Sequence, residues 1–325
     1  MCLAGRFYFS MKVLIRHRDS GSRKLMARLT PLLPGVQLVD WLPAETDPDW
    51  DGVDAVVAIG RLDRPAMQRG KFGFIQTMGT GYDHVDIDAA TELGIYVANL
   101  PAALTGNAQS VAEHAILLML ALARRLNDAE ENARQGRWAQ PLGRALLDKT
   151  VCIVGLGDLG MALAARLHAF EMRVQAIRRD PRKGAPVYVQ LVNTPGDADF
   201  VILCARPNGE NVHMVSREWL ASMKKGSILV NVARGSLVDE QALAEALASG
   251  HLGGAGLDVF DEEPANPSNP LLQNPRVIAT PHVAGVTDVN LERSFQWLAD
   301  NLQRYARGEQ PRFLVNQPLF VRQLN

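Results

Sequence analysis

Four polar side chains in the last third of the sequence are of types that bind anions or transfer protons: Arg234, Asp258, Glu263 and His282. A guanidinium can hold a carboxylate and a neighbouring carbonyl oxygen in its planar fork. Histidine can donate a proton near neutral pH, and a carboxylate beside it orients the ring and favours its protonated form. We therefore expect Glu263 to pair with His282. Taken singly, each residue also fits an ordinary role: Arg234 in a surface ion pair, Asp258 as a helix cap or in a turn, Glu263 as part of a solvated acidic run, and His282 as a loop histidine.

A glycine motif organises the elements that could position these residues. The apolar and β-branched run at 151–154 predicts a strand, and the segment at 161–170 predicts a helix. Between them, Gly-x-Gly-x-x-Gly allows a tight turn, a close approach of backbone to a pyrophosphate, and packing of the helix on the strand. The positions predicted to contact the phosphates are Gly155, Gly157, Asp158, Leu159 and Gly160. The motif thus favours dinucleotide binding over the alternative of a plain glycine-rich turn.

The end of the next predicted strand, at 173–177, bears on which dinucleotide binds. NAD sites usually place Asp or Glu there to hold the ribose 2′-OH, whereas this chain has Arg178 and Arg179. Two guanidiniums can hold a 2′-phosphate, which favours NADP. The alternative is that Asp180 reaches the ribose of NAD and the arginines form a solvated loop face.

Strands and helices alternate after this point, which predicts a parallel α/β sheet. The expected elements are strands at 200–204, 227–232, 254–257 and 277–279 and a helix at 240–249. Open α/β sheets bind ligands beyond the carboxyl ends of their strands, where the four polar residues lie. Behind a dinucleotide fold they supply what hydride transfer to a 2-oxo acid requires. Further positions predicted to line the cofactor are Cys204, Arg206, Val232, Ala233, Asp258, His282 and Gly285.

The N-terminal part predicts a second parallel α/β layer, with strands at 12–15, 37–41, 55–59, 73–78 and 94–97 and a helix at 22–33. Because it has no phosphate-binding glycine motif of its own, we assign it to the substrate. The turn Gly79-Thr80-Gly81 could present backbone N–H groups to a carboxylate, although a plain turn explains it equally well.

The longest predicted helix covers residues 107–126, and a final helix at 287–307 returns the chain to the first layer. Ser110 to Glu113 fits a capping box, although the apolar pattern could also begin a turn earlier. Ile116 to Ala123 is apolar on every face, so both sides need cover. One side can pack on its own domain and the other on a second copy, which predicts a homodimer; burial wholly within the chain is the alternative.

Composition excludes several classes of protein. The chain has 325 residues, 47% hydrophobic and 21% charged, as expected for a globular protein of two domains. Its formal net charge of −1 gives no reason to expect nucleic acid or a membrane surface as partner, and no metal site is predicted. The scattered Cys2, Cys152 and Cys204 fit core packing in a reducing cytoplasm, and residues 1–10 are expected to be an extension.

The sequence closely resembles the D-isomer-specific 2-hydroxyacid dehydrogenases over nearly everything from Met11 onward. The motifs that carry the resemblance are Gly79-Thr-Gly-Tyr-Asp83, Ser110-Val-Ala-Glu-His114, Gly155-Leu-Gly-Asp-Leu-Gly160, Val230-Asn-Val-Ala-Arg-Gly-Ser-Leu-Val-Asp239, Leu257-Asp-Val-Phe with Glu263-Pro264, and Thr280-Pro-His-Val-Ala-Gly285. The last three in this order are highly specific.

The resemblance implies that Arg234 binds substrate, that Glu263 supports His282 as acid/base, and that Thr80 and Gly81 offer N–H groups to the substrate carboxylate. It implies two Rossmann-like or flavodoxin-like α/β domains with an active site in the cleft between them. The substrate domain would be discontinuous, at 11–106 plus 288–325, and the dinucleotide domain would span 107–287. It also implies a dimer formed through the long helix.

Two positions depart from the family pattern. Glu171 stands where glycine is common, which we expect to alter only a turn, and Arg206-Pro-Asn208 replaces a more usual Pro-Leu-Thr near the expected cofactor. Arg178 and Arg179 resemble the NADP-preferring glyoxylate and hydroxypyruvate reductases. We therefore expect an NADPH-dependent reductase of a small 2-oxo acid. The alternatives are an NAD-dependent dehydrogenase with another substrate and a dinucleotide-sensing protein like the corepressors of this fold.

Overall fold

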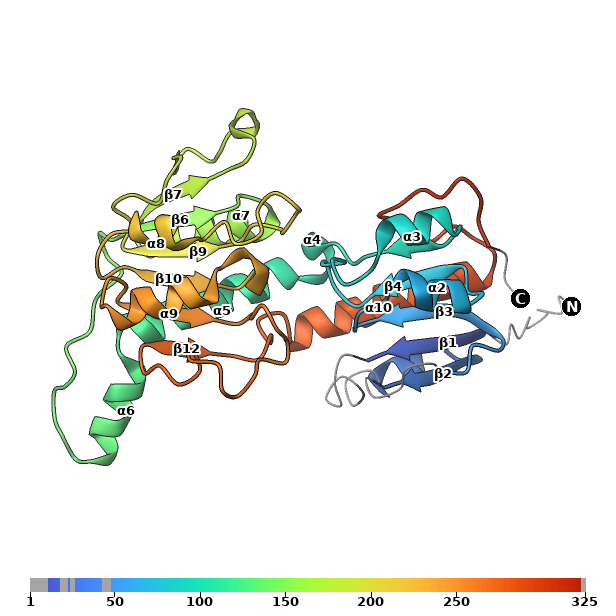
Figure 1. Cartoon of the computed structure of the whole chain (residues 1–325), viewed down its shortest axis with the longest axis horizontal. Coiled ribbons are helices and arrows are strands. Elements are labelled where there is room, and N and C mark those ends of the chain that lie inside the picture. Colours follow the sequence, from blue (N-terminus) through green and yellow to red (C-terminus); the bar gives the residue numbers. More distant parts are fainter. Residues whose placement is uncertain (1–10, 18–22, 24–26, 43–47, 323–325) are drawn as a thin grey trace, which may run out of the picture. The chain divides into compact units, whose positions relative to one another are not determined.

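The structure, a computed structural model, describes residues 11–17, 23, 27–42 and 48–322. The chain divides into two compact units (Figure 1). The first unit is made of two segments of the chain, one up to Gly106 and one from Asp288 onward, and the second unit spans Asn107–Thr287. The expected extension at 1–10, with Cys2, lies outside the described residues. So does part of the helix predicted at 22–33, whose described portion contains the 3₁₀ helix η1 (Ala27–Leu32).

The first unit is built on a five-stranded parallel sheet ordered β2-β1-β3-β4-β5. Its central strand β3 (Val53–Ala58) is buried at every position, because helices cover both faces. Alternate β3 side chains enter two separate clusters, one with α10 (Asp288–Ala306) and the other with α2 (Arg64–Arg69) and α3 (Ile87–Glu92). The remaining elements are β1 (Met11–Arg16), β2 (Val36–Trp41), β4 (Phe74–Thr77), β5 (Tyr96–Ala98) and α4 (Ala102–Thr105).

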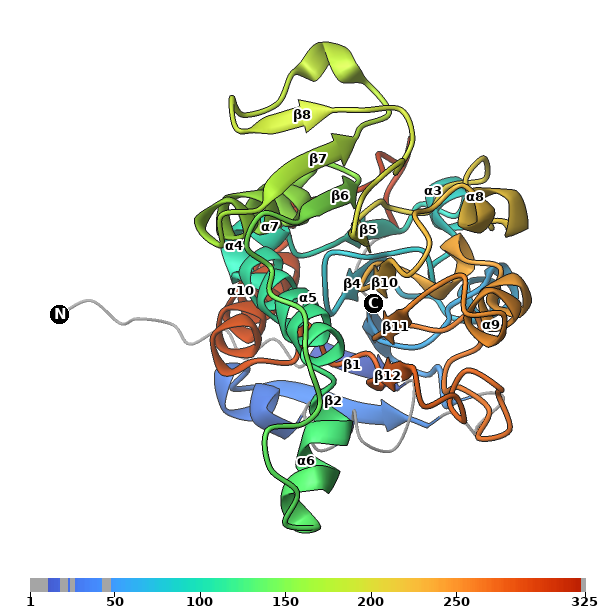
Figure 2. The ribbon, with the colours of Figure 1, turned by 90° about the vertical axis from the view of Figure 1, so that its left-hand side faces the viewer.

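The second unit holds a seven-stranded parallel sheet ordered β12-β11-β10-β9-β6-β7-β8. The chain runs outward from β6 (Thr150–Val154) through β7 and β8 (Figure 2). It then returns to the other side of β6 at β9. The remaining strands are β7 (Arg173–Ile177), β8 (Val189–Leu191), β9 (Phe200–Leu203), β10 (Ile228–Asn231), β11 (Gly254–Leu257) and β12 (Val277–Ala279). The helices are α5 (Asn107–Ala123), α6 (Leu126–Arg134), α7 (Asp158–Ala169), α8 (Arg217–Ala221) and α9 (Glu240–Ala248), with 3₁₀ helices η2 (Pro181–Lys183) and η3 (Gly235–Leu237). The predicted α/β class with parallel sheets is confirmed.

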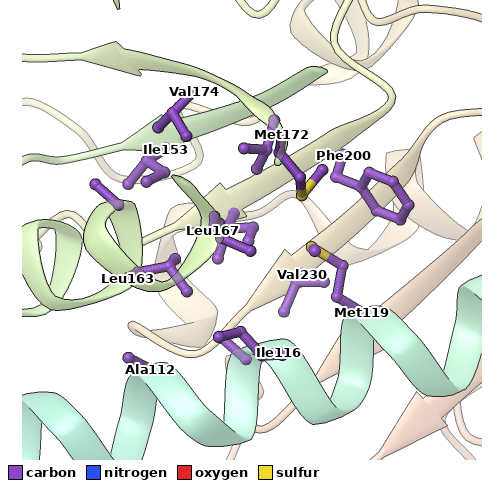
Figure 3. Packing of buried hydrophobic residues seen from close by; sticks show 14 of the residues in the cluster. Ala112, Ile116, Met119, Ile153, Leu163, Leu167, Met172, Val174, Phe200 and Val230 are labelled. Carbon is purple, nitrogen blue, oxygen red and sulfur yellow. The ribbon is translucent and has the colours of Figure 1, made fainter. Parts of the chain in front are cut away.

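Helix α5 is packed mainly within its own unit. Figure 3 shows Ile116 and Met119 of α5 among the buried side chains of α7, β9 and β10. Within the fully described stretch Ile116–Ala123, Leu117 is the one exposed side chain, at 55%. The apolar faces of this helix therefore do not by themselves require a second copy of the protein.

The ends of α5 differ from the prediction. The helix begins at Asn107, so Ser110 lies inside it, and the Ser110 hydroxyl is 2.8 Å from Thr287 Oγ1. The capping box is therefore wrong, because Ser110 lies within the helix and not at its N-cap, and the alternative of a start one turn earlier is what the structure has. The helix also ends at Ala123, and α6 follows after Arg125, which is left-handed with φ 52°. No helix in the described part of the chain has the length and apolarity needed to cross a membrane.

Candidate active site

The second unit gathers the predicted cofactor and catalytic residues at one edge of its sheet. Because all its strands are parallel, their carboxyl ends lie on the same edge, and neighbours in the strand order are hydrogen-bonded. From β12 to β7, the residues that follow the strands are His282, Asp258 with Glu263, Val232 to Arg234, Cys204 with Arg206, Gly155 to Gly160, and Arg178 with Arg179. The topology thus gives these residues one contiguous edge.

The three glycines after β6 meet different steric demands. Gly155 has φ 103°, and a Cβ there would lie 2.7 Å from the backbone of Ala205. A Cβ at Gly160 would lie 2.1 Å from the carbonyl oxygen of Gly155, so strand and helix require glycine at this contact. A Cβ at Gly157 would meet, apart from its neighbours along the chain, no atom of the described residues within 4 Å. The fold therefore needs the first and third glycines, while the space beside Gly157 is open to a ligand.

The start of α7 offers donors to that space. Gly157 is its N-cap and supplies no side-chain cap, and the Met161 N–H donates to the Gly157 carbonyl oxygen at 2.8 Å. The N–H groups of Asp158, Leu159 and Gly160 precede this first helical bond and so have no partner within the helix. Free N–H groups at the positive end of a helix dipole suit a pyrophosphate, so these residues fit a dinucleotide.

The loop after β7 contains the residues that bear on the ribose. Arg178 donates from Nη1 to the Gly184 carbonyl oxygen at 2.6 Å, and Arg179 is exposed and forms no ion pair with any described residue. The Asp180 carboxylate accepts from Arg182 Nε at 2.8 Å and from the Arg182 N–H at 3.2 Å. The side-chain hydrogen bond from Arg182, which outweighs desolvation, lowers the pKa of Asp180. The Asp180 carboxylate is thus engaged by Arg182 at the N-terminus of η2.

The loops after β9 and β10 contribute mainly backbone and buried groups. Burial raises the pKa of the Cys204 thiol, which stays neutral. Val232 and Ala233 are buried, whereas Arg206 is exposed. Their predicted contacts with a cofactor remain predictions.

Arg234 stands on a loop that is fixed from two sides. The Asn231 side chain donates from Nδ2 to the Arg234 carbonyl oxygen at 2.8 Å and accepts the Ala233 N–H at 3.1 Å. Gly235 lies so close to the loop after β11 that a Cβ there would approach the carbonyl carbon of Phe260 to 1.9 Å. This contact places the Arg234 loop directly against the loop that carries Glu263.

The pair predicted from the sequence is formed. His282 Nδ1 lies 2.7 Å from Glu263 Oε2, and Glu263 Oε1 accepts the Phe260 N–H at 3.1 Å. Since an ionised carboxylate can only accept, Nδ1 carries the hydrogen. The two side chains are 31% and 21% exposed, so the ring is shielded and still accessible.

Asp258 holds the loop that carries His282. Its carboxylate is 1% exposed and accepts from Thr280 Oγ1 at 2.6 Å, the Val283 N–H at 2.9 Å and the Ala284 N–H at 2.9 Å. The His282 N–H donates to the Asp258 carbonyl oxygen at 2.7 Å. The ordinary role considered for Asp258, in a turn, is thus what its contacts show, and its contact with a cofactor remains a prediction.

Sequence reasoning missed two members of this network. His114 Nε2 on α5 lies 2.9 Å from Thr280 Oγ1 and 3.6 Å from Asp258 Oδ1. Because the Thr280 hydroxyl donates to the carboxylate, it must accept from His114, which fixes a hydrogen on His114 Nε2. Both residues lie in motifs that the sequence displays, but no local pattern pairs positions so far apart.

The predicted carboxylate-binding turn lies in the first unit, after β4. The Thr80 hydroxyl donates to the Leu100 carbonyl oxygen at 2.9 Å, and Asn99 Nδ2 donates to the Thr80 carbonyl oxygen at 2.9 Å. Within the described part of the chain, the N–H groups of Thr80 and Gly81 donate to no acceptor. The turn is therefore fixed by its other groups, and these two donors are left for a ligand.

Comparison with known proteins identifies the family. The model of the NAD binding domain of D-isomer specific 2-hydroxyacid dehydrogenases matches residues 116–284. A glyoxylate reductase of Korarchaeum cryptofilum is 38% identical over 76% of this chain and 77% of its own length.

Two solved structures extend the likeness over almost the whole chain. One is the NADPH-dependent glyoxylate/hydroxypyruvate reductase of Sinorhizobium meliloti in complex with NADP and malonate, with a TM-score of 0.83, 32% identity, and coverage of 96% of this chain and 99% of that one. The other is the NAD-dependent formate dehydrogenase of Staphylococcus aureus in complex with NAD, with a TM-score of 0.82, 26% identity, and coverage of 95% and 100%. The chain therefore belongs to the D-isomer specific 2-hydroxyacid dehydrogenase family and is an NAD(P)-dependent oxidoreductase.

Proposed function

We propose that this enzyme uses NADPH to reduce a small 2-oxo acid to the D-2-hydroxy acid, with glyoxylate and hydroxypyruvate as the first candidates. The observation that carries the proposal is the His282–Glu263 hydrogen bond, next to the Arg234 loop and at the ligand-binding edge of a dinucleotide sheet. The relatives named glyoxylate reductase and glyoxylate/hydroxypyruvate reductase support this substrate class.

Each residue has a definite part in this reaction. The dinucleotide, when bound, supplies the hydride. Arg234 binds the substrate carboxylate and polarises the carbonyl, and the free N–H groups of Thr80 and Gly81 are further donors for the carboxylate. His282 holds a proton at Nε2 and gives it to the carbonyl oxygen, while Glu263 keeps the other hydrogen on Nδ1 and stabilises the charged ring. Formate dehydrogenases are expected to have Gln in place of this Glu, which argues against that activity.

The loop after β7 supports NADPH over NADH. Asp180, the candidate ligand of a ribose 2′-OH, is engaged by Arg182, whereas Arg179 is exposed without an ion-pair partner in the described chain. An exposed guanidinium at this strand end suits a 2′-phosphate. The Sinorhizobium meliloti relative is NADPH-dependent and supports the same choice, while NADH use would require Asp180 to leave Arg182.

The assignment of domains, assembly and location belongs to the same proposal. We assign dinucleotide binding to Asn107–Thr287 and substrate binding to the other unit. A homodimer would cover the exposed apolar side chains Leu126, Trp138 and Leu142, which are 51%, 91% and 92% exposed and follow α5. A cytoplasmic location agrees with the free thiols of Cys152 and Cys204.

The test is steady-state oxidation of NADPH and NADH, side by side, with glyoxylate, hydroxypyruvate, pyruvate and a bulkier 2-oxo acid. We expect NADPH to be preferred, and Arg179→Ser to raise the KM for NADPH roughly tenfold or more, because a charge-assisted contact to phosphate is lost. Arg182→Ser is the matched variant, since it frees Asp180 and should lower the KM for NADH. A wild-type preference for NADH would refute the cofactor choice, and failure to reduce any of these acids would refute the substrate class.

A further inference from the structure

Helix α5 packs so closely on β11 that one of its histidines reaches the carboxyl end of the strand. A Cβ at Gly254 would lie 3.2 Å from Leu122 Cδ2, and a Cβ at Gly256 would lie 2.9 Å from Leu118 Cβ. Leu122, Leu118 and His114 are spaced four residues apart and therefore share one face of the helix. Four helical residues and two strand residues each span about 6–7 Å, so the next contact falls between His114 and the loop after β11.

Two distances show which group His114 holds. His114 Nε2 lies 2.9 Å from Thr280 Oγ1 but 3.6 Å from Asp258 Oδ1, so the histidine donates to the hydroxyl and not to the carboxylate. The Thr280 hydroxyl lies 2.6 Å from the same carboxylate oxygen and donates its one hydrogen there. Nε2 carries a hydrogen both in the neutral tautomer that this contact selects and in the charged ring, so the link does not depend on the charge of His114. The three side chains thus form one directed chain of hydrogen bonds.

The middle member of this chain is also bonded to the loop that carries His282. The Thr280 N–H donates to the Leu257 carbonyl oxygen at 2.8 Å, and the Thr280 carbonyl oxygen accepts the His282 N–H at 3.1 Å. The Asp258 oxygen that accepts the Thr280 hydroxyl also accepts the Val283 N–H at 2.9 Å. The direction of this hydroxyl therefore affects the loop on both sides of His282.

A hydroxyl group turns about its C–O bond unless a donor and an acceptor fix it. Within the described part of the chain, His114 is the one donor to the Thr280 hydroxyl. The His114 side chain is only 14% exposed, so water has little access to replace it. We propose that His114 is a positioning residue for the proton transfer assigned to His282, and that it acts through Thr280 and Asp258. The inference rests on the proposed function, in which His282 is the proton donor.

The first test compares two substitutions at His114 that differ in hydrogen bonding. His114→Met fills the space and removes the donor, whereas the amide of His114→Gln can still donate to Thr280. We expect single-turnover hydride transfer from bound NADPH to glyoxylate to slow about two- to tenfold in His114→Met, the range that loss of one hydrogen bond gives. His114→Gln should restore most of the rate. The dissociation constant of NADPH should be unchanged in both variants.

The matched control is Glu113→Gln, at the neighbouring position of α5, where the side chain is 66% exposed. This variant should transfer hydride at the wild-type rate. Equal loss in Glu113→Gln would overturn the inference, because the helix as a whole and not the His114 hydrogen bond would then be responsible.

Double variants show whether His114 acts through the residues assigned to it. If it acts through Thr280, His114→Met should slow hydride transfer no further in a Thr280→Val background. If it serves His282, His114→Met should also slow the residual reaction no further in a His282→Ala background, where the positioned group is gone. A general structural role would lower the rate in both backgrounds, and full additivity in either one would overturn the inference.

Amide hydrogen exchange at Val283 and Ala284, measured without substrate, separates this inference from the proposed function. We expect both amides to exchange about two- to tenfold faster in His114→Met and at nearly the wild-type rate in His114→Gln. If the wild-type protein reduces none of the acids tested, the proposed function fails, and the exchange rates alone decide whether His114 holds the loop.

The inference is overturned if His114→Met keeps the wild-type rates of hydride transfer and amide exchange, or if His114→Gln loses as much as His114→Met. If His114→Met does not fold, His114→Asn takes its place in every comparison, because its amide is one methylene too short to reach Thr280.

Discussion

Asp258→Asn tests how the loop that carries His282 is held. The carboxylate is 1% exposed and accepts one hydroxyl and two backbone N–H groups, at 2.6 to 2.9 Å. Asparagine has the same shape but keeps one acceptor oxygen, so its NH₂ group must face a donor, most directly the Ala284 N–H. One charge-assisted hydrogen bond is lost and one buried donor is left unpaired, which costs about 2–4 kcal/mol.

The assay has to distinguish opening of the His282 loop alone from a loss of stability of the whole unit. Urea unfolding followed by circular dichroism reports the whole unit, whereas amide hydrogen exchange at Val283 and Ala284 reports opening of the loop alone. If the loop opens by itself, these amides should exchange roughly 30- to 700-fold faster, the range that about 2–4 kcal/mol gives at 1.4 kcal/mol per tenfold. We expect kcat/KM to fall as the loop opens, because His282 loses its fixed position.

The control is Asp261→Asn in the same loop region, where the carboxylate is 52% exposed. That variant should change exchange and unfolding little. If Asp258→Asn leaves the amide exchange rates and the urea midpoint at wild-type values, the hydrogen bonds do not hold the loop and the reasoning is wrong. If only the NADPH dissociation constant rises, Asp258 acts on the cofactor, as the sequence predicted, and not on the loop.

Three more predictions follow from single residues. His282→Ala should lower kcat by about 10²–10⁴-fold and leave NADPH binding nearly unchanged, as measured by turnover and fluorescence titration; equal loss of both would contradict its role as proton donor. Glu171 has φ 59°, so Glu171→Gly should raise the urea-derived unfolding free energy by about 1 kcal/mol, and a loss would show that the turn is not strained. Burial raises the pKa of the Cys152 thiol to about 12, so this thiol should resist thiol reagents at pH 8 until the protein unfolds. The stability that the neutral thiol provides should decline as the pH rises from about 8.5 toward about 12. Rapid labelling of Cys152 in the native protein would refute the prediction.

The sequence predicts strands best where a short apolar run is bounded by turn residues. β7, β11 and β12 have the predicted bounds, because their runs end at a charged pair, an aspartate and a Thr-Pro step. Short helices are harder, since α2 and α3 have six residues each and too few turns to show a period. Their aspartate N-caps, Asp63 and Asp86, were the available signal, because each carboxylate accepts a backbone N–H three residues on.

In the candidate site, too, some features could be predicted from the sequence and others could not. Glu263 and His282 could be paired from residue type and from the resemblance, because general acid chemistry needs a histidine and a partner. The contacts that fix Glu263 and His282 could not be predicted from the sequence. His114 and Thr280 are separated by 166 positions and meet only because α5 lies against the sheet. Asn231 holds the Arg234 loop through its amide, and nothing in the local pattern distinguishes that asparagine from an ordinary strand end.

The backbone of His282 explains why so many hydrogen bonds converge on this loop. His282 has φ 55°, a left-handed conformation that costs a non-glycine residue about 1–2 kcal/mol. Such a residue persists only where its surroundings over-determine it. Here the His282 N–H donates to the Asp258 carbonyl oxygen at 2.7 Å, and the ring Nδ1 lies 2.7 Å from the Glu263 carboxylate, so backbone and side chain are fixed by two different residues. Asp258 sets where the ring stands and Glu263 sets which nitrogen carries the hydrogen, and a proton donor needs both.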